Sequence, residues 1–310
     1  MQKPLLVHLK LLCVAAIWGA GWAAGRIMAL EMPPITGAWL RYFIAITCFL
    51  VWLKVIGQLK MPTKGEWKRV FIIGFFSTTV YQAFFMFGMK YTAAGDASLM
   101  ITFNPLFTAL LAIPFLSEKM NPRLGFGLAL GVSGAWVLFL YSPNVDLPYS
   151  ERLLGDALIA IAALAWATSS ILMKKAMSEP AADAEEPLSP LTLTVWASVA
   201  GFVFLTPWAG WETIQGGIPS IGAQAWGATI FLAILSTVVA YVWFADGIKV
   251  LGAGKAAFYV YLVPVFGILT GWLVLDEKLG WSLALAFVLI VGGVALAQSE
   301  KRLQRMASAP

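Results

Sequence analysis

The chain has 310 residues, of which 60% are hydrophobic and only 12% charged, and its mean hydropathy is +0.81. Soluble domains carry roughly 25% charged residues, so this composition excludes a water-soluble globular protein and predicts one embedded in lipid. The net charge of +5 does not indicate a nucleic-acid partner, because the basic residues lie between apolar segments and form no basic patch with stacking aromatics.

Apolar stretches separated by charged, proline or glycine breaks predict ten membrane-spanning helices, each near the roughly 20 residues that cross a bilayer. In chain order they are expected at residues 6–29, 34–56, 67–89, 94–116, 122–141, 153–177, 188–208, 221–247, 252–274 and 280–298. Pro34, Pro122 and Pro190 lie near helix starts, where a missing backbone N–H costs nothing. Cys13 and Cys48 lie inside apolar stretches without metal-ligand spacing, so we interpret them as packing residues.

The distribution of basic residues predicts the orientation. With the amino terminus in the cytoplasm, sixteen Lys and Arg residues fall in cytoplasmic segments, and five fall on the other side or within the membrane. This asymmetry follows the positive-inside rule. It predicts a multi-pass protein of the bacterial inner membrane with both termini in the cytoplasm.

An internal repeat divides the chain. Residues 71–119 align without gaps on residues 230–278, at a constant offset of 159. The identical pairs include Ser77 with Ser236, Phe85 with Phe244, Gly95 with Gly254, Pro105 with Pro264, and Glu118 with Glu277. We therefore expect two five-helix halves, residues 1–145 and 150–300. Because five spans is an odd number, the second half is predicted to be inverted relative to the first, an arrangement typical of alternating-access transporters.

Several short motifs recur in both halves. They are Trp18 and Trp166 in the leading helices, the Asn104-Pro105 and Val263-Pro264 steps, and the Ser117-Glu118-Lys119 and Asp276-Glu277-Lys278-Leu279-Gly280 helix exits. Together they resemble EamA-type exporters of the drug/metabolite transporter superfamily, over residues 6–298. The resemblance implies an all-α integral membrane protein with a cavity formed mainly by helices one, three, four, six, eight and nine. It also implies dimer contacts through helices five and ten, and the export of amino acids or related metabolites.

Polar and aromatic side chains deep in the membrane are the candidate substrate-binding residues, because polar groups are costly in lipid unless they face a cavity or each other. The predicted set is Trp18, Trp22, Arg41, Ser77, Tyr81, Gln82, Asn104, Trp166, Tyr241 and Tyr259. The tryptophans would form an aromatic wall whose indole N–H groups bind a carboxylate, and Arg41 would attract an anion. Core packing, hydrogen bonding between helices and snorkelling to head groups are the structural alternatives for the same residues.

The remaining charged and kinked positions receive more local interpretations. Pro105 and Pro264 each remove a backbone hydrogen bond inside a helix, which predicts gating hinges or, alternatively, fixed bends. Arg26 is expected to reach the head groups or to pair with Glu31, and attraction of an anionic carboxylate is the alternative. Glu118 and its repeat partner are interpreted as structural residues that pair with nearby cations.

These observations favour secondary transport of small metabolites such as amino acids, by alternating access and in the export direction. A multidrug or organic-cation exporter, a nucleotide-sugar-like carrier and a channel are the alternatives. A membrane enzyme is disfavoured because His8 is the only histidine and no nucleophile–base pair is evident, and no phosphate-binding loop for ATP is present. We expect no cofactor or metal, and the expected partners are a small-molecule substrate and the lipid bilayer. Proton coupling lacks support, because Asp96 and Asp246 lie near predicted helix ends and no acid is central.

Overall fold

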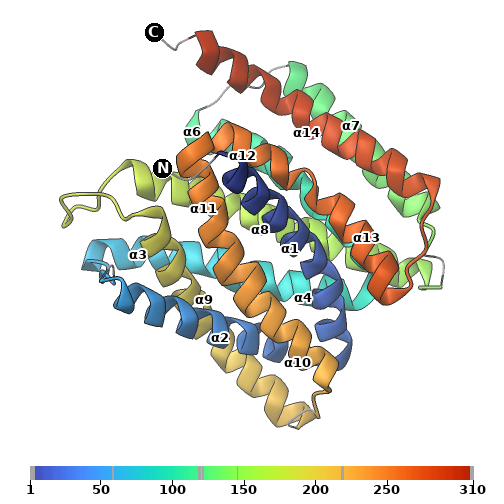
Figure 1. Ribbon diagram of the computed structural model, residues 1–310, viewed down its shortest axis with the longest axis horizontal. Coiled ribbons are helices and arrows are strands. Elements are labelled where there is room, and N and C mark those ends of the chain that lie inside the picture. Colours follow the sequence, from blue (N-terminus) through green and yellow to red (C-terminus); the bar gives the residue numbers. More distant parts are fainter. Residues whose placement is uncertain are drawn as a thin grey trace.

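The computed structural model describes residues 4–57, 59–117, 120, 122–144, 146–217 and 220–307, and all of its secondary structure in these residues is helical (Figure 1). Within them, ten helices are long and apolar enough to cross a membrane. The predicted all-α, ten-helix fold is therefore confirmed. Glu118, Lys119 and the contacts expected of them lie outside the described residues.

The first five spans contain several short helices as well as long ones. In order they are α1 (Pro4–Glu31), α2 (Pro34–Val55), α3 (Lys64–Gly74), the π-helix η1 (Phe75–Val80), α4 (Tyr81–Tyr91), α5 (Ala94–Met100), the 3-10 helix η2 (Ile101–Phe103), α6 (Asn104–Leu116) and α7 (Pro122–Tyr141). The third span thus comprises α3, η1 and α4, and the fourth comprises α5, η2 and α6.

The last five spans follow the same pattern. They are α8 (Tyr149–Ser178), α9 (Pro190–Gly216), α10 (Ala223–Ile230), the π-helix η3 (Phe231–Val239), α11 (Ala240–Leu251), α12 (Ala253–Val260), α13 (Val263–Leu275) and α14 (Trp281–Ala307). The eighth span comprises α10, η3 and α11, and the ninth comprises α12 and α13.

The seventh span is longer than the sequence predicts. We expect its end near residue 208, because Pro207 and Gly210 resemble a break, yet α9 continues to Gly216. A proline removes only one backbone hydrogen bond, and a helix in a membrane bundle tolerates that loss. The chain leaves the helix at Gly217, where a φ of 74° favours glycine.

Both predicted proline steps coincide with a change of helix geometry. The 3-10 helix η2 directly precedes the Asn104-Pro105 step, and α13 begins at Val263, one residue before Pro264. Because neither proline can donate a backbone hydrogen bond, the preceding turn is free to tighten. The structure places an irregular turn at each predicted hinge, and movement about these turns stays a prediction.

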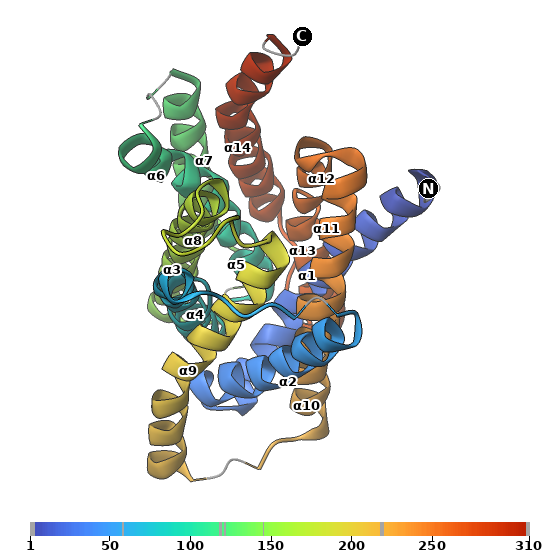
Figure 2. The same cartoon turned by 90° about the vertical axis from the view of Figure 1, so that its left-hand side faces the viewer.

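Because ten is an even number of spans, α1 begins and α14 ends on the same side of the bundle, as Figure 2 shows. We call this the terminal side, and the side where α1 ends and α2 begins the opposite side. Helices α7 and α14 lie side by side along one edge of the bundle (Figure 1). Their backbones are in close contact, because a Cβ atom added at Gly127 would lie 2.4 Å from the Gly293 carbonyl oxygen. Dimer contacts through these two helices, the fifth and tenth spans, stay a prediction.

Glycines also hold α9 against the third span. A Cβ atom added at Gly201 would lie 2.3 Å from the Thr78 Cβ atom and 2.5 Å from the carbonyl oxygen of Gly74. The two helices therefore touch backbone to backbone at this level, as is common where small residues line a helix contact in membranes.

Replacing Gly201 with valine should lower the melting temperature of the detergent-solubilised protein, because overpacking costs about 1–3 kcal/mol. The matched control is Gly210→Val on the same helix, where an added Cβ atom has no neighbour within 4 Å. Thermal unfolding of both variants measures the difference. Equal melting temperatures would show that the α9 contact is looser than described.

Candidate functional site

A cavity of about 390 Å³ lies at the centre of the bundle. Its walls come from α1, α2, α4, η2, α6, α8, η3, α11, α12 and α13, so both halves of the chain contribute. The volume falls in the roughly 300–1,000 Å³ range of small-molecule sites. The predicted site and gating residues that line it are Trp18, Trp22, Arg41, Tyr81, Gln82, Asn104, Pro105, Trp166, Tyr241 and Pro264.

Two predicted residues do not line the cavity. Ser77 is buried in η1, with its hydroxyl 3.5 Å from that of Thr78. Tyr259 lies towards the terminal side, with its hydroxyl 2.6 Å from Nδ1 of His8. The structure thus gives both side chains intramolecular partners away from the cavity.

Sequence reasoning missed several lining residues, among them Tyr42, Phe85 and Phe244. Phe85 and Phe244 are equivalent in the repeat, so the alignment at an offset of 159 could have identified them as a pair of lining residues. Their rings contact Trp22 and Trp18 at centroid distances of 5.4 Å and 5.1 Å, which extends the aromatic wall on both sides of the cavity.

Arg41 is the cation of the cavity wall, and only 8% of it is exposed. Its Nη1 donates to Oε1 of Gln82 (3.3 Å) and its Nη2 donates to Oγ1 of Thr237 (3.1 Å). Its Nε is buried without a hydrogen-bond partner, and within the described residues no carboxylate forms an ion pair with it. A buried guanidinium that lacks a counter-ion is costly, and an anion entering the cavity would relieve that cost.

The Arg41 guanidinium is held in place by neutral groups. It lies 5.7 Å from the ring centroid of Tyr42 and 6.0 Å from that of Phe85, and the Gln82 amide that accepts from it donates in turn to the Tyr42 hydroxyl (3.2 Å). Hydrogen bonds and cation–π contacts orient the charge without neutralising it. The arrangement therefore leaves a preorganised positive site.

The aromatic side chains divide into those with satisfied polar groups and those without. The Trp18 Nε1 donates to the carbonyl oxygen of Ser236 in η3 (3.0 Å), so this N–H is not free to bind a carboxylate as we expect from the sequence. The Trp166 ring lies 5.2 Å from that of Tyr81, and its Nε1 has no partner in the described part of the chain. Trp166 is thus the better candidate for donating to a cargo, while Trp18 presents its ring.

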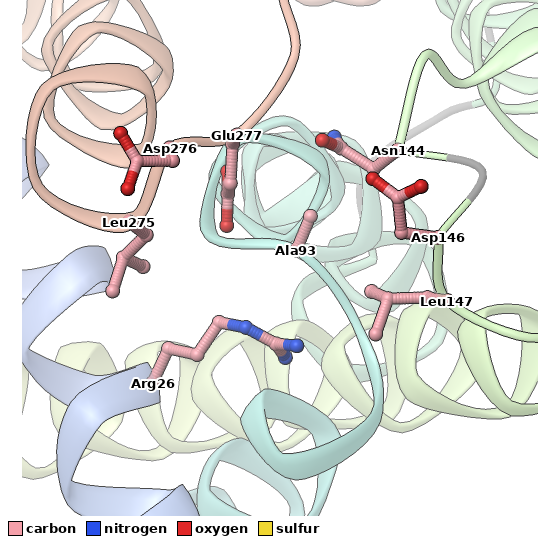
Figure 3. A pocket seen from close by; sticks show the side chains of 8 residues that line it. All are labelled: Arg26, Ala93, Asn144, Asp146, Leu147, Leu275, Asp276 and Glu277. Atoms are coloured by element: carbon pink, nitrogen blue, oxygen red, sulfur yellow. The ribbon is translucent and has the colours of Figure 1, made fainter.

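Helices α5 and α13 touch on the opposite side, where a Cβ atom added at Gly95 would lie 3.5 Å from the Ile268 side chain, and Figure 3 shows Glu277 beside Ala93 at this contact. The Glu277 carboxylate, in the link after α13, accepts from the backbone N–H groups of Ala94 (2.5 Å) and Gly95 (2.9 Å) at the start of α5. Deeper in the contact, a Cβ atom added at Gly267 would lie 2.5 Å from the Ser98 Cβ atom. We call this set of contacts the α5–α13 gate. Burial raises the pKa of Glu277, against the lowering by these two hydrogen bonds and by Arg26.

Arg26 supports the gate from α1 and does not pair with Glu31. Its Nη1 donates to the carbonyl oxygens of Met89 (2.9 Å) and Thr92, where α4 ends. The predicted pairing with Glu31 is therefore wrong, and contact with the head groups stays a prediction. Arginine instead satisfies carbonyls that the end of a helix leaves unpaired. In the described residues, no group of three or more His, Cys, Asp or Glu side chains is placed to hold a metal ion.

Two segments of the chain, residues 5–140 and 153–298, match the sequence model of the EamA-like transporter family. The chain belongs to the EamA-like transporter family. The resemblance seen in the sequence is thereby confirmed, and with the ten apolar helices it makes the protein a multi-pass membrane transporter and not an enzyme.

Relatives of this EamA-family member include an uncharacterized transporter of Archaeoglobus fulgidus, 27% identical over 95% of this chain and 98% of the relative. A probable amino-acid metabolite efflux pump of Escherichia coli is 26% identical over 91% of each chain. A solved crystal structure aligns with a TM-score of 0.61 at 20% identity, over 94% of this chain and 98% of that one. At that identity the likeness supports the fold alone.

Proposed function

We propose that this transporter exports a small carboxylate-bearing metabolite, such as an amino acid, across the bacterial inner membrane. The observation that carries the proposal is Arg41, a buried cation in the cavity wall without an acidic partner among the described residues. A cargo carboxylate would accept from the guanidinium, and the aromatic wall would contact the remainder of the cargo. The similarity to a probable amino-acid metabolite efflux pump of Escherichia coli supports an amino-acid cargo.

The same residue disfavours the alternatives. An organic cation would be repelled by Arg41, and the described cavity lining contains no carboxylate to attract it. A nucleotide sugar carries a diphosphate, which is usually held by several basic side chains, and the described lining contains only one.

Alternating access between two inverted halves is the mechanism we propose. With the terminal side in the cytoplasm, as the basic residues favour, the closed α5–α13 gate would face outward and the cavity would load from within. Release would require this gate to open while the terminal side closes, with the irregular turns before Pro105 and Pro264 as the bending points.

A resistance screen tests the proposal. Cells that overproduce the protein should survive toxic amino-acid analogues that inhibit cells carrying an empty vector, and radiolabelled forms of the protective compounds should undergo counterflow in proteoliposomes. Saturable counterflow supports a carrier. Resistance to cationic drugs alone, or flux that rises linearly without counterflow, would contradict the proposal.

A further inference from the structure

A second polar cluster lies outside the cavity, behind the α5–α13 gate. Asp96 on α5 and Asp156 on α8 are both fully buried. The Asp96 carboxyl accepts from the Ser142 hydroxyl (2.6 Å), and Oδ1 of Asp156 accepts from the Thr92 hydroxyl (2.5 Å). The second carboxyl oxygen of Asp156, Oδ2, is buried without any hydrogen-bond partner. A fully ionised carboxylate in that position would leave a charged oxygen unsolvated.

The arginine beside the two acids does not bond to either of them. Arg152, which is 4% exposed, donates through its two Nη atoms to the backbone carbonyl oxygens of Asn144 (3.3 Å) and Phe139 (3.1 Å). It therefore contributes its charge to the cluster without a direct ion pair. Its guanidinium also lies 5.7 Å from the ring centroid of Tyr149.

A count of the ionisable groups gives an excess of acids. The buried groups of the cluster are the Asp96 and Asp156 carboxyls and the Arg152 guanidinium, and the partly buried Glu277 and Arg26 lie beside them at the gate. The other charged groups nearby are exposed and solvated: Lys90 at the end of α4, Glu151 on α8, Asp276 after α13, and Lys278, which pairs with Asp146 at 2.8 Å. With all five buried and partly buried groups ionised the cluster would carry one excess negative charge, and its two fully buried acids, Asp96 and Asp156, would be ionised away from bulk water, which is unfavourable.

We propose that Asp96 and Asp156 form a proton-binding site that holds one shared proton while the α5–α13 gate is closed. A proton satisfies the Asp156 oxygen that lacks a partner, and it removes the excess charge. Unlike a metal cation, it needs no set of ligands beside the positive Arg152. Asn144, whose amide donates to Asp96 (3.5 Å), connects this site to the opposite side, where it lines a pocket of about 130 Å³ with Arg26 and Glu277 (Figure 3).

Proton binding and gate closure are then linked. Separation of α5 from α13 would hydrate Asp96 and restore its ionisation, so the closed gate binds the proton more tightly than the open one. By reciprocity, acidification favours the closed gate. Glu277 affects gate closure in the same direction, because burial at the gate raises the pKa of its carboxyl. Its contribution to closure is therefore present at low pH and is lost as the pH rises. The inference that this proton acts as a coupling ion for transport rests on the proposed function.

Infrared spectroscopy of the lipid-reconstituted protein tests the site without any cargo. At neutral pH the wild type should show the C=O stretch of a buried protonated carboxyl. Asp96→Asn and Asp156→Asn should each remove it, because either change leaves the remaining acid balanced by Arg152. Asp183→Asn, at an exposed carboxylate on the terminal side, should leave it unchanged. A wild type without the band, or a band that survives both cluster variants, would overturn the site, whatever the outcome of the transport assays.

A thiol reporter tests the linkage. Ser98 is fully buried in the gate, so Ser98→Cys, in a chain with Cys13 and Cys48 replaced by serine, should react with a maleimide only when the gate opens. In nanodiscs, the labelling rate of this protein should increase with pH by about tenfold more than the rate of its Asp156→Asn derivative. The derivative is the control, because its thiol ionises in the same way. Parallel pH profiles would overturn the linkage.

Discussion

Replacement of Arg41 by methionine is expected to weaken transport strongly while it raises the melting temperature. The guanidinium is buried without an acid partner among the described residues, and a buried ion carries a desolvation penalty of roughly several kcal/mol that an apolar side chain of similar length avoids. A cargo carboxylate would lose a charge-assisted hydrogen bond of roughly 1.5–3 kcal/mol, which lowers affinity about 10- to 100-fold. Counterflow and thermal unfolding measure the two effects.

The opposite signs of the two effects separate a binding role from a structural one. If Arg41 serves mainly to hold Gln82 and Thr237 in place, Arg41→Met should lower the melting temperature as well as activity. Arg69→Met is the matched control, because Arg69 donates to backbone carbonyls of the exposed loop after α8 and does not line the cavity. Unchanged counterflow in Arg41→Met would remove this residue from the site.

The fold was predictable because the bilayer imposes it. Each crossing needs about 20 apolar residues, so the ten spans follow from hydropathy, and their ends differ from prediction mainly where α9 passes Pro207. The proline steps and most lining residues were also predictable, because polar and aromatic side chains at mid-depth have few places to lie except a cavity or a helix contact.

What a side chain does within the cavity depended on packing between distant segments. Trp18 and Trp166 are equivalent by sequence, yet only Trp18 donates to a carbonyl, because η3 presents the Ser236 oxygen to it. A π-helix leaves carbonyl oxygens without their usual backbone partners, and the local sequence of residues 231–239 does not predict a π-helix.

The acidic cluster escaped sequence reasoning for a similar reason. Asp156 lies two turns into α8 and follows Glu151 and Arg152, which makes it resemble a solvated helix start. Its burial arises because Gly155 lets Thr92 approach: a Cβ atom added at Gly155 would lie 2.6 Å from the Thr92 backbone nitrogen. Only the three-dimensional contact between the end of α4 and the start of α8 reveals the acid as buried.

Replacement of Gly267 by valine should force the α5–α13 gate open and stop transport. The added side chain would overlap Ser98, and overpacking of about 1–3 kcal/mol corresponds to a shift of roughly 5- to 150-fold in the gate equilibrium. Hydrogen–deuterium exchange of the α5 backbone should accelerate by a similar factor. Gly292→Val on α14, where an added Cβ atom has no neighbour within 4 Å, should leave both exchange and counterflow unchanged.

The same substitution distinguishes a gate from a static contact. In the first half, the position equivalent to Gly267 is Thr108, so the terminal side lacks a glycine at this level of its own helix contact. Valine at 267 should therefore bias the balance between the two sides and leave the melting temperature little changed, because opening relieves the overlap. A large loss of stability with unchanged exchange in α5 would mean that α5 and α13 are permanently packed, and alternating access would then need a different moving contact.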